Sequence, residues 1–171
     1  DVDKVARYYE SLGIGPFESL DLKHKARERR LRGELADDLK LISIMVHIGP
    51  LRLELIEPVA GEKSLWREFL EKRGEGGSHL CFFVDDIDKV EAALSNKEQE
   101  GIKVVYRTRF QDGGGAIYFE SDKIGGLIFE LTQWPPEYCS GERKDETMSK
   151  PPFSRLDHVA VVIRDMDKAI K

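Results

Sequence analysis

Little in this sequence points to secretion, to a membrane or to nucleic acid. It contains only two cysteines, Cys81 and Cys139, so we expect no disulfide framework and a reducing compartment. No apolar run approaches the length of a membrane span, and no signal peptide is visible. The net charge of -5 argues against a nucleic-acid partner, because such proteins need a basic face to displace counterions. We therefore expect a cytoplasmic protein that acts on a small molecule and has no membrane or nucleic-acid partner.

One short phrase occurs three times, at residues 1–4, 86–89 and 165–168, and reads Asp-x-Asp-Lys in each copy. The second and third copies follow, at the same distance, an apolar run that opens with a histidine, His79 or His158. The repeated unit is therefore a strand followed by a helix, which must pack on another such unit to bury its apolar face. The first copy lacks its strand and the last stops inside its helix, so we expect a fragment of a longer protein or a permuted chain.

Apolar spacing and turn residues predict the elements between these copies. A capping box of Asp88 and Glu91 is expected to start the second of the repeated helices, and Pro58 is expected to close a strand. The predicted helices cover residues 2–12, a short stretch from Ser64, and 88–96, and the predicted strands cover 41–48, 51–58, 79–84, 102–106, 116–119 and 127–132. Residues 1–133 thus read as two βαβββ halves, the first without its N-terminal strand.

Three ionisable residues lie at the start or in the middle of predicted strands: Glu54, His79 and Glu130. Such groups are costly in a core unless they are paired or bind a metal. If the halves pack as paired modules, these strands can turn one imidazole and two carboxylates toward a shared cleft. The complete copies place their histidine seven residues before the repeated Asp, so a second histidine is expected just upstream of Asp1. His158 is the only visible residue of that type.

We predict an α+β fold in which paired βαβββ modules form curved mixed sheets that enclose a metal cleft. Residues 1–133 are expected to form this domain and residues 134–151 a linker rich in Pro, Glu, Lys and Ser. Residues 152–171 are expected to form the first strand and the helix start of a further module.

Four motifs carry a resemblance to a known family: residues 53–58 (LELIEP), 69–79 (FLEK, then GGSH), 84–88 (VDDID) and 125–133 (GGLIFELTQ). With them the chain resembles the vicinal oxygen chelate superfamily, and within it methylmalonyl-CoA epimerases and glyoxalase-like proteins. The resemblance implies that Glu54, His79 and Glu130 are three of the four ligands of a divalent metal. His158 matches the fourth ligand type but belongs to the next repeat.

The function implied by the resemblance is that of a metal-dependent isomerase acting on an acyl-CoA thioester of the methylmalonyl type. The metal would stabilise an enolate, and a carboxylate, Glu130 or Glu54, would transfer the proton. Co, Ni, Mn, Fe or Zn would each suit such a ligand set. Some epimerases place a glutamate base on the strand before that of Glu54, but residues 41–47 contain none here.

Three other functions stay open at this point. A lyase of the glyoxalase I (lactoylglutathione lyase) type would use the same metal and enolate on a thiol adduct of a 2-oxoaldehyde. A metal-free small-molecule-binding protein of the superfamily would have apolar or small residues at the ligand positions, which the carboxylates of Glu54 and Glu130 argue against. A ferrous ring-cleaving dioxygenase would need two histidines and one carboxylate.

Two further segments have expected roles. The charged run 23–32 is expected to form a mobile excursion between strands, which could hold the phosphates of CoA. Strand 156–163 can fill the open edge of the first half, within the chain or in a neighbouring copy, and so bring His158 to the site. The assembly would then be either a homodimer or a pairing of tandem modules. Alternatively, His158 starts a separate second site.

Overall fold

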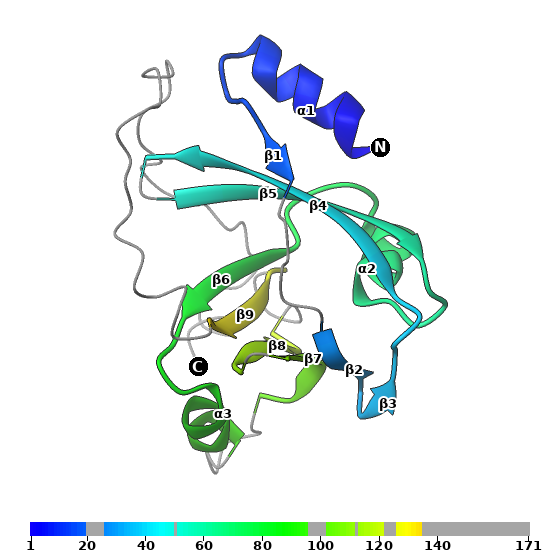
Figure 1. The fold of residues 1–171 in the computed structure, drawn as a ribbon. Coiled ribbons are helices and arrows are strands. Elements are labelled where there is room, and N and C mark those ends of the chain that lie inside the picture. The colour runs from blue at the N-terminus through cyan, green and yellow to red at the C-terminus, as the bar shows by residue number, and fades with distance from the viewer. Residues whose placement is uncertain (20–25, 50, 96–101, 112, 122–125, 135–171) are drawn as a thin grey trace, which may run out of the picture. The chain divides into compact units, whose positions relative to one another are not determined.

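The computed structural model describes residues 1–19, 26–49, 51–95, 102–111, 113–121 and 126–134. These residues form two compact units, one made of residues 1–19 and 38–62 and the other of 26–37 and 63–134. Both units combine helical structure with a β-sheet, one helix in the first unit and two in the second (Figure 1), which confirms the α+β prediction. Within the described ranges, no helix is long and apolar enough to cross a membrane.

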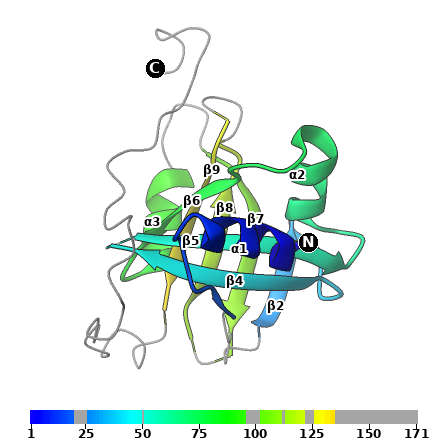
Figure 2. The same ribbon diagram turned by 90° about the horizontal axis from the view of Figure 1, so that it is seen from above.

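The first unit is a helix on a three-stranded antiparallel sheet of order β1-β4-β5. The helix α1 (Val2–Ser11) packs over β4 and β5 (Figure 2), and its N-cap Asp1 accepts a hydrogen bond from the Lys4 backbone N–H at 3.1 Å. The strands are β1 (Glu18–Ser19), β4 (Lys40–Ile48) and β5 (Leu51–Ala60). We predicted that Pro58 closes β5, but the strand continues to Ala60. Pro58 pairs with Leu41, and a register shift beyond this pair lets Ala60 pair with Lys40.

The second unit contains a six-stranded sheet of order β3-β2-β7-β8-β9-β6. Neighbouring strands are antiparallel except β6 and β9, which are parallel, so the sheet is mixed as predicted. Its strands are β2 (Ala26–Leu31), β3 (Glu34–Leu35), β6 (His79–Phe83), β7 (Val104–Phe110), β8 (Gly115–Phe119) and β9 (Ile128–Gln133), and its helices are α2 (Leu65–Arg73) and α3 (Ile87–Ser95). The run β6-α3-β7-β8-β9 is the predicted βαβββ order.

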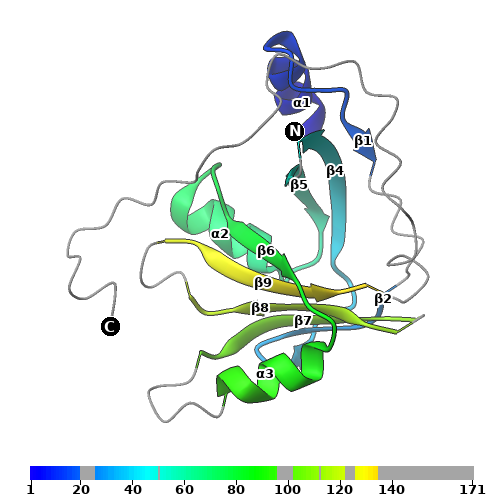
Figure 3. The ribbon, with the colours of Figure 1, turned by 90° about the vertical axis from the view of Figure 1, so that its left-hand side faces the viewer.

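The two helices cover opposite faces of this sheet (Figure 3). On one face, α3 contributes Ile87 to a buried cluster that it forms with Ile117, Phe119 and Leu131. Each such side chain contributes about 1.5–3 kcal/mol by its removal from water. On the other face, Trp66 of α2 packs edge-on against Tyr106 and Tyr118, with ring centroids 5.0 and 5.5 Å away. Burial on both sides keeps every residue of β8 away from solvent.

The charged run does not form the predicted excursion. Residues 23–25 lie outside the described part, but Ala26–Leu31 is strand β2, which pairs with β3 on one side and β7 on the other. Part of its charge is neutralised locally, since Arg30 forms an ion pair with Glu28. At the turn after β2, Arg32 binds Glu68 of α2 with two hydrogen bonds of 2.7 Å. A paired backbone and matched charges therefore replace the apolar face that the run lacks.

The start of α3 also differs from the prediction. Asp86, not Asp88, accepts a hydrogen bond from the Lys89 backbone N–H, at 2.9 Å from its Oδ1 atom. Asp88 lies inside the helix and forms an ion pair with Arg109, and Glu91 forms one with Arg107. The predicted capping box is therefore wrong, because both of its carboxylates bind arginines of β7 instead.

This difference gives a test by mutation. Asp86→Ala should lower the free energy of unfolding by about 1 kcal/mol, the usual loss when an N-cap side chain is removed. Asp88→Ala is the matched control and should cost only a few tenths of a kcal/mol, because its ion pair with Arg109 is exposed (71% for Asp88). Urea unfolding of both variants measures the difference. Equal losses would contradict the assignment of Asp86 as the cap.

Several predictions fall outside the described residues. These are the further module at 152–171 with His158, and the linker except for residue 134. They stay predictions.

Candidate functional site

His79 and Glu130 form a buried pair on neighbouring strands of the second unit. In the parallel register of β6 and β9, Cys81 lies opposite Glu130, so His79, two residues earlier, projects from the same face of the sheet. The His79 Nε2 and Glu130 Oε2 atoms are 3.0 Å apart, and the two side chains are 10% and 9% exposed. The sequence predicted both residues as site residues, and the fold brings them into contact.

Other polar side chains hold this pair in place. The Thr132 hydroxyl donates to Glu130 Oε1 at 2.8 Å, and the Tyr118 hydroxyl also donates to the Glu130 carboxylate. Ser78 Oγ lies 2.8 Å from His79 Nδ1, which orients the imidazole from its other nitrogen. The pair is therefore fixed from both ends.

The surroundings of Glu130 keep it ionised. Burial alone would raise the pKa of its carboxyl, but the hydrogen bond and charge of His79, with the hydroxyls of Thr132 and Tyr118, outweigh burial and lower that pKa. The neighbouring Tyr106 behaves oppositely, since burial raises the pKa of its hydroxyl to about 12. At neutral pH the face thus carries a carboxylate that accepts hydrogen bonds and a phenol that can donate one.

Glu54 belongs to the first unit. It lies in the middle of β5, opposite Met45 of β4, is half-buried, and accepts a hydrogen bond from the Ser43 hydroxyl. Among the described residues, no cluster of three or more His, Cys, Asp or Glu side chains is placed to hold a metal ion. The grouping of Glu54 with His79 and Glu130 stays a prediction, and His158 lies outside the described part.

The sequence analysis missed the residues that support the pair. Thr132 could have been found, because it lies two residues after Glu130 and must share its face of the strand. Ser78 lies next to His79 inside one of the quoted motifs. Tyr118 had no local signal, because its place opposite Glu130 depends on the register of β8 and β9.

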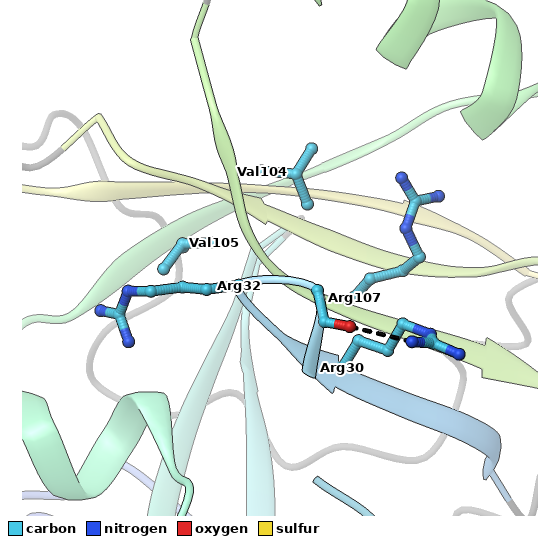
Figure 4. A pocket seen from close by; sticks show the side chains of 6 residues that line it. Arg30, Arg32, Val104, Val105 and Arg107 are labelled. Atoms are coloured by element: carbon cyan, nitrogen blue, oxygen red, sulfur yellow. Dashed lines mark hydrogen bonds between the residues drawn. The ribbon is translucent and has the colours of Figure 1, made fainter. Parts of the chain in front are cut away.

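A small pocket of about 210 Å³ lies elsewhere in the second unit, at the turn after β2 (Figure 4). Arginines line it, but each already has a partner. Arg30 donates to the Gly33 carbonyl oxygen at 2.8 Å and forms an ion pair with Glu28. Arg32 points the other way and binds Glu68, and Arg107 binds Glu91. These contacts hold the turn and its neighbours together.

Comparison with known families agrees with this arrangement. Residues 1–119 match the model of the Glyoxalase/Bleomycin resistance protein/Dioxygenase superfamily. The chain belongs to this superfamily. A curated relative, the uncharacterized protein YqjC of Bacillus subtilis (strain 168), is 26% identical over 105 residues, which cover 60% of this chain and 72% of that protein. The predicted membership is therefore confirmed.

Solved structures of superfamily members have the same fold. The methylmalonyl-CoA epimerase of Mycobacterium tuberculosis is similar with a TM-score of 0.52 and 21% identity, over 82% of this chain and 85% of that one. A methylmalonyl-CoA epimerase in complex with methylmalonyl-CoA and NH4+ gives a TM-score of 0.53 at 22% identity, over 80% and 88%. A Streptomyces coelicolor methylmalonyl-CoA epimerase variant in complex with 2-nitronate-propionyl-CoA gives the same values, 0.53 and 22%, over 80% and 88%. At these identities the similarity concerns the fold.

Proposed function

We propose that this protein is a metal-dependent isomerase that moves a proton on an acyl-CoA thioester of the methylmalonyl type. The observation that carries the proposal is the buried contact of His79 with Glu130, on the strands where the superfamily resemblance expects metal ligands. Two of the solved structures of similar fold hold acyl-CoA ligands, which supports this substrate class.

The pair would suit a divalent ion, because imidazole nitrogen and carboxylate oxygen are both common metal ligands. The His79 Nε2 and Glu130 Oε2 atoms lie side by side, 3.0 Å apart. Ser78 at the other imidazole nitrogen and Thr132 at the other carboxylate oxygen are the outer partners that metal ligands usually have. Glu54 and His158 are the proposed remaining ligands, with His158 supplied by the same chain or a neighbouring copy.

The two carboxylates suit different roles. When bound, a divalent ion would act as a Lewis acid that stabilises negative charge on the substrate oxygens. Glu130 has a lowered pKa and is therefore a weak base, which suits it to hold the ion. We assign the proton transfer to Glu54, whose carboxylate is oriented by the Ser43 hydroxyl.

Metal content and proton exchange test the proposal together. The full chain, loaded with Co²⁺ or Zn²⁺, should retain bound metal by mass spectrometry and should exchange the C2 proton of methylmalonyl-CoA with deuterium from the solvent. His79→Ala should weaken metal binding by more than the roughly 10- to 100-fold that outer-shell partners cost, and should abolish exchange. His47→Gln is the matched control, because His47 is an exposed residue of β4.

The outcomes separate the parts of the proposal. Metal binding without proton exchange would contradict the isomerase function, while the proposed metal site would still stand. Loss of metal from His47→Gln as large as from His79→Ala would contradict the assignment of the ligand.

A metal-free binding protein is the second candidate, because one observation favours it. The Glu130 carboxylate has three hydrogen-bond partners within the protein, His79, Thr132 and Tyr118, and so is satisfied without an ion. This function predicts that acyl-CoA binding persists in a chelator and that no exchange occurs with any of the ions tested.

A further inference from the structure

Three side chains of β6 lie in a row on the face of the second sheet that carries Glu130. They are His79, Cys81 and Phe83, which are two residues apart and therefore share a face of the strand. Cys81 Sγ lies 3.5 Å from Thr132 Oγ1, and Phe83 is opposite Thr132 in the register of β6 and β9. A strand rises about 3.3 Å per residue, so the row begins at the buried pair and ends about 13 Å from His79.

The exposure of these side chains increases along the row. The His79 side chain is 10% exposed, Cys81 is exposed, and Phe83 is 59% exposed. On the other side of the pair, Tyr118 is buried and the ring of Trp66 packs edge-on against it. Within the second unit, bulky rings thus close the face toward β8, whereas β6 leaves it accessible. A ligand that reaches the pair therefore approaches it over Cys81 and Phe83.

The exposed end of the row is aromatic. The centroid of the Phe83 ring lies 6.5 Å from that of Trp134, the half-buried residue that follows β9. The Trp134 ring is in turn stacked on Phe110, with centroids 5.8 Å apart and an angle of 16° between the planes. A mostly exposed phenylalanine beside a ring held in place by stacking is a surface that apolar ligand atoms can cover.

We infer that Cys81, Phe83 and Trp134 form a binding surface for the pantetheine arm of an acyl-CoA whose reacting acyl group lies at His79 and Glu130. The inference rests on the proposed function for the choice of ligand. The arm is long and flexible and carries methylene and methyl groups between its amides, so it can follow the row while the rings cover its apolar groups. None of the three side chains is a cation, so the surface suits the uncharged arm and not the phosphates of the nucleotide.

Two neighbouring phenylalanines test this surface. Phe83→Ala should weaken the binding of methylmalonyl-CoA to the full chain roughly tenfold by calorimetry, because the arm would cover about half of a phenylalanine side chain. The loss should be equal for methylmalonyl-pantetheine, which lacks the nucleotide. Phe82→Ala is the matched control, because Phe82 is 50% exposed but lies on the opposite face, against Phe129. It should leave both affinities unchanged.

The thiol of Cys81 reports on the same surface. In a Cys139→Ser variant, Cys81 is the remaining cysteine. Its alkylation by iodoacetamide should slow about tenfold when methylmalonyl-CoA is present at about ten times its Kd, because only the free protein reacts. The control places a thiol on the opposite face by Phe82→Cys, in a chain that also carries Cys81→Ser and Cys139→Ser, and should react at an unchanged rate. If circular dichroism shows that Phe83→Ala is unfolded, the alkylation rates decide.

Each result bears on the inference. Binding of neither thioester, equal affinities of the Phe83→Ala and Phe82→Ala variants, or an alkylation rate of Cys81 that methylmalonyl-CoA does not change would overturn it. A loss on Phe83→Ala that is confined to methylmalonyl-CoA would assign the surface to the nucleotide and overturn the assignment to the arm. An equal loss for both thioesters, in a protein that exchanges no proton with solvent, would refute the proposed reaction and leave the binding surface standing.

Discussion

Replacing His79 by alanine should destabilise the folded protein by about 3 kcal/mol at pH 7. The reason is the carboxylate that remains. Glu130 has a 9% exposed side chain and loses the partner that contributes most to keeping it charged. The hydroxyls of Thr132 and Tyr118 still donate to it, but two neutral hydrogen bonds compensate burial of a charge less well than an imidazole does. Urea unfolding at pH 7 measures the loss.

The same substitution should reverse the sign of the pH dependence due to Glu130. In the unchanged protein the pKa of Glu130 is lowered, so its contribution to stability is present above the ordinary glutamate pKa of about 4.3 and is lost as the pH falls through the lowered value. Without His79, burial dominates and raises that pKa. The contribution of Glu130 is then present at low pH and is lost as the pH rises through the raised value.

The double variant His79→Ala with Glu130→Gln isolates this effect, because glutamine does not titrate. Between pH 5 and pH 7 the single variant should lose stability relative to the double variant. Parallel pH profiles of the two variants would show that the charge of Glu130 does not depend on His79.

Gly114→Ala should destabilise the protein by about 3 kcal/mol or more. Gly114 has a φ of +75°, which strains any other L-residue, and a Cβ atom there would overlap the backbone carbonyl oxygen of Gln133. Because Gln133 is the last residue of β9, relief of the overlap must move either the entry to β8 or the end of the strand that carries Glu130.

Gly113→Ala is the control that measures the cost of the positive φ alone, without a steric overlap. Gly113 also has a positive φ, +97°, but its Cβ position is open, with no atom within 4 Å. It should cost about 1–2 kcal/mol. Thermal unfolding compares the two variants, and equal midpoints would rule out the overlap with Gln133 as the cause.

The sequence predicted the part of the fold that depends on local patterns. The repeated strand and helix identified β6 and α3, and alternation identified β4, β5, β8 and β9. It failed at β2, because residues 26–31 have no apolar alternation and form a strand only through pairing with β3 and β7. Their charges are matched by residues such as Glu68, far along the chain.

The candidate site divides in the same way. His79 and Glu130 could be predicted because an ionisable residue in an apolar strand needs a partner, and the family motifs include both. Tyr118 could not, because it does not stand out in its own strand. Its place in the site follows from the register of β8 and β9, and a register is a property of the folded sheet.

The pairing of β2 with β7 has a consequence for how the chain can be divided and in what order it can fold. A fragment that starts at residue 63 would contain every strand from β6 to β9 but would leave one edge of β7 without its neighbour, and such edges promote aggregation. Arg30 of β2 pairs with Arg107 of β7, so forming this pair of strands closes a long loop. The pairing therefore belongs to the slow, non-local steps of folding. Expression as two separate halves cut at residue 63 should therefore give soluble protein only when both halves are present together.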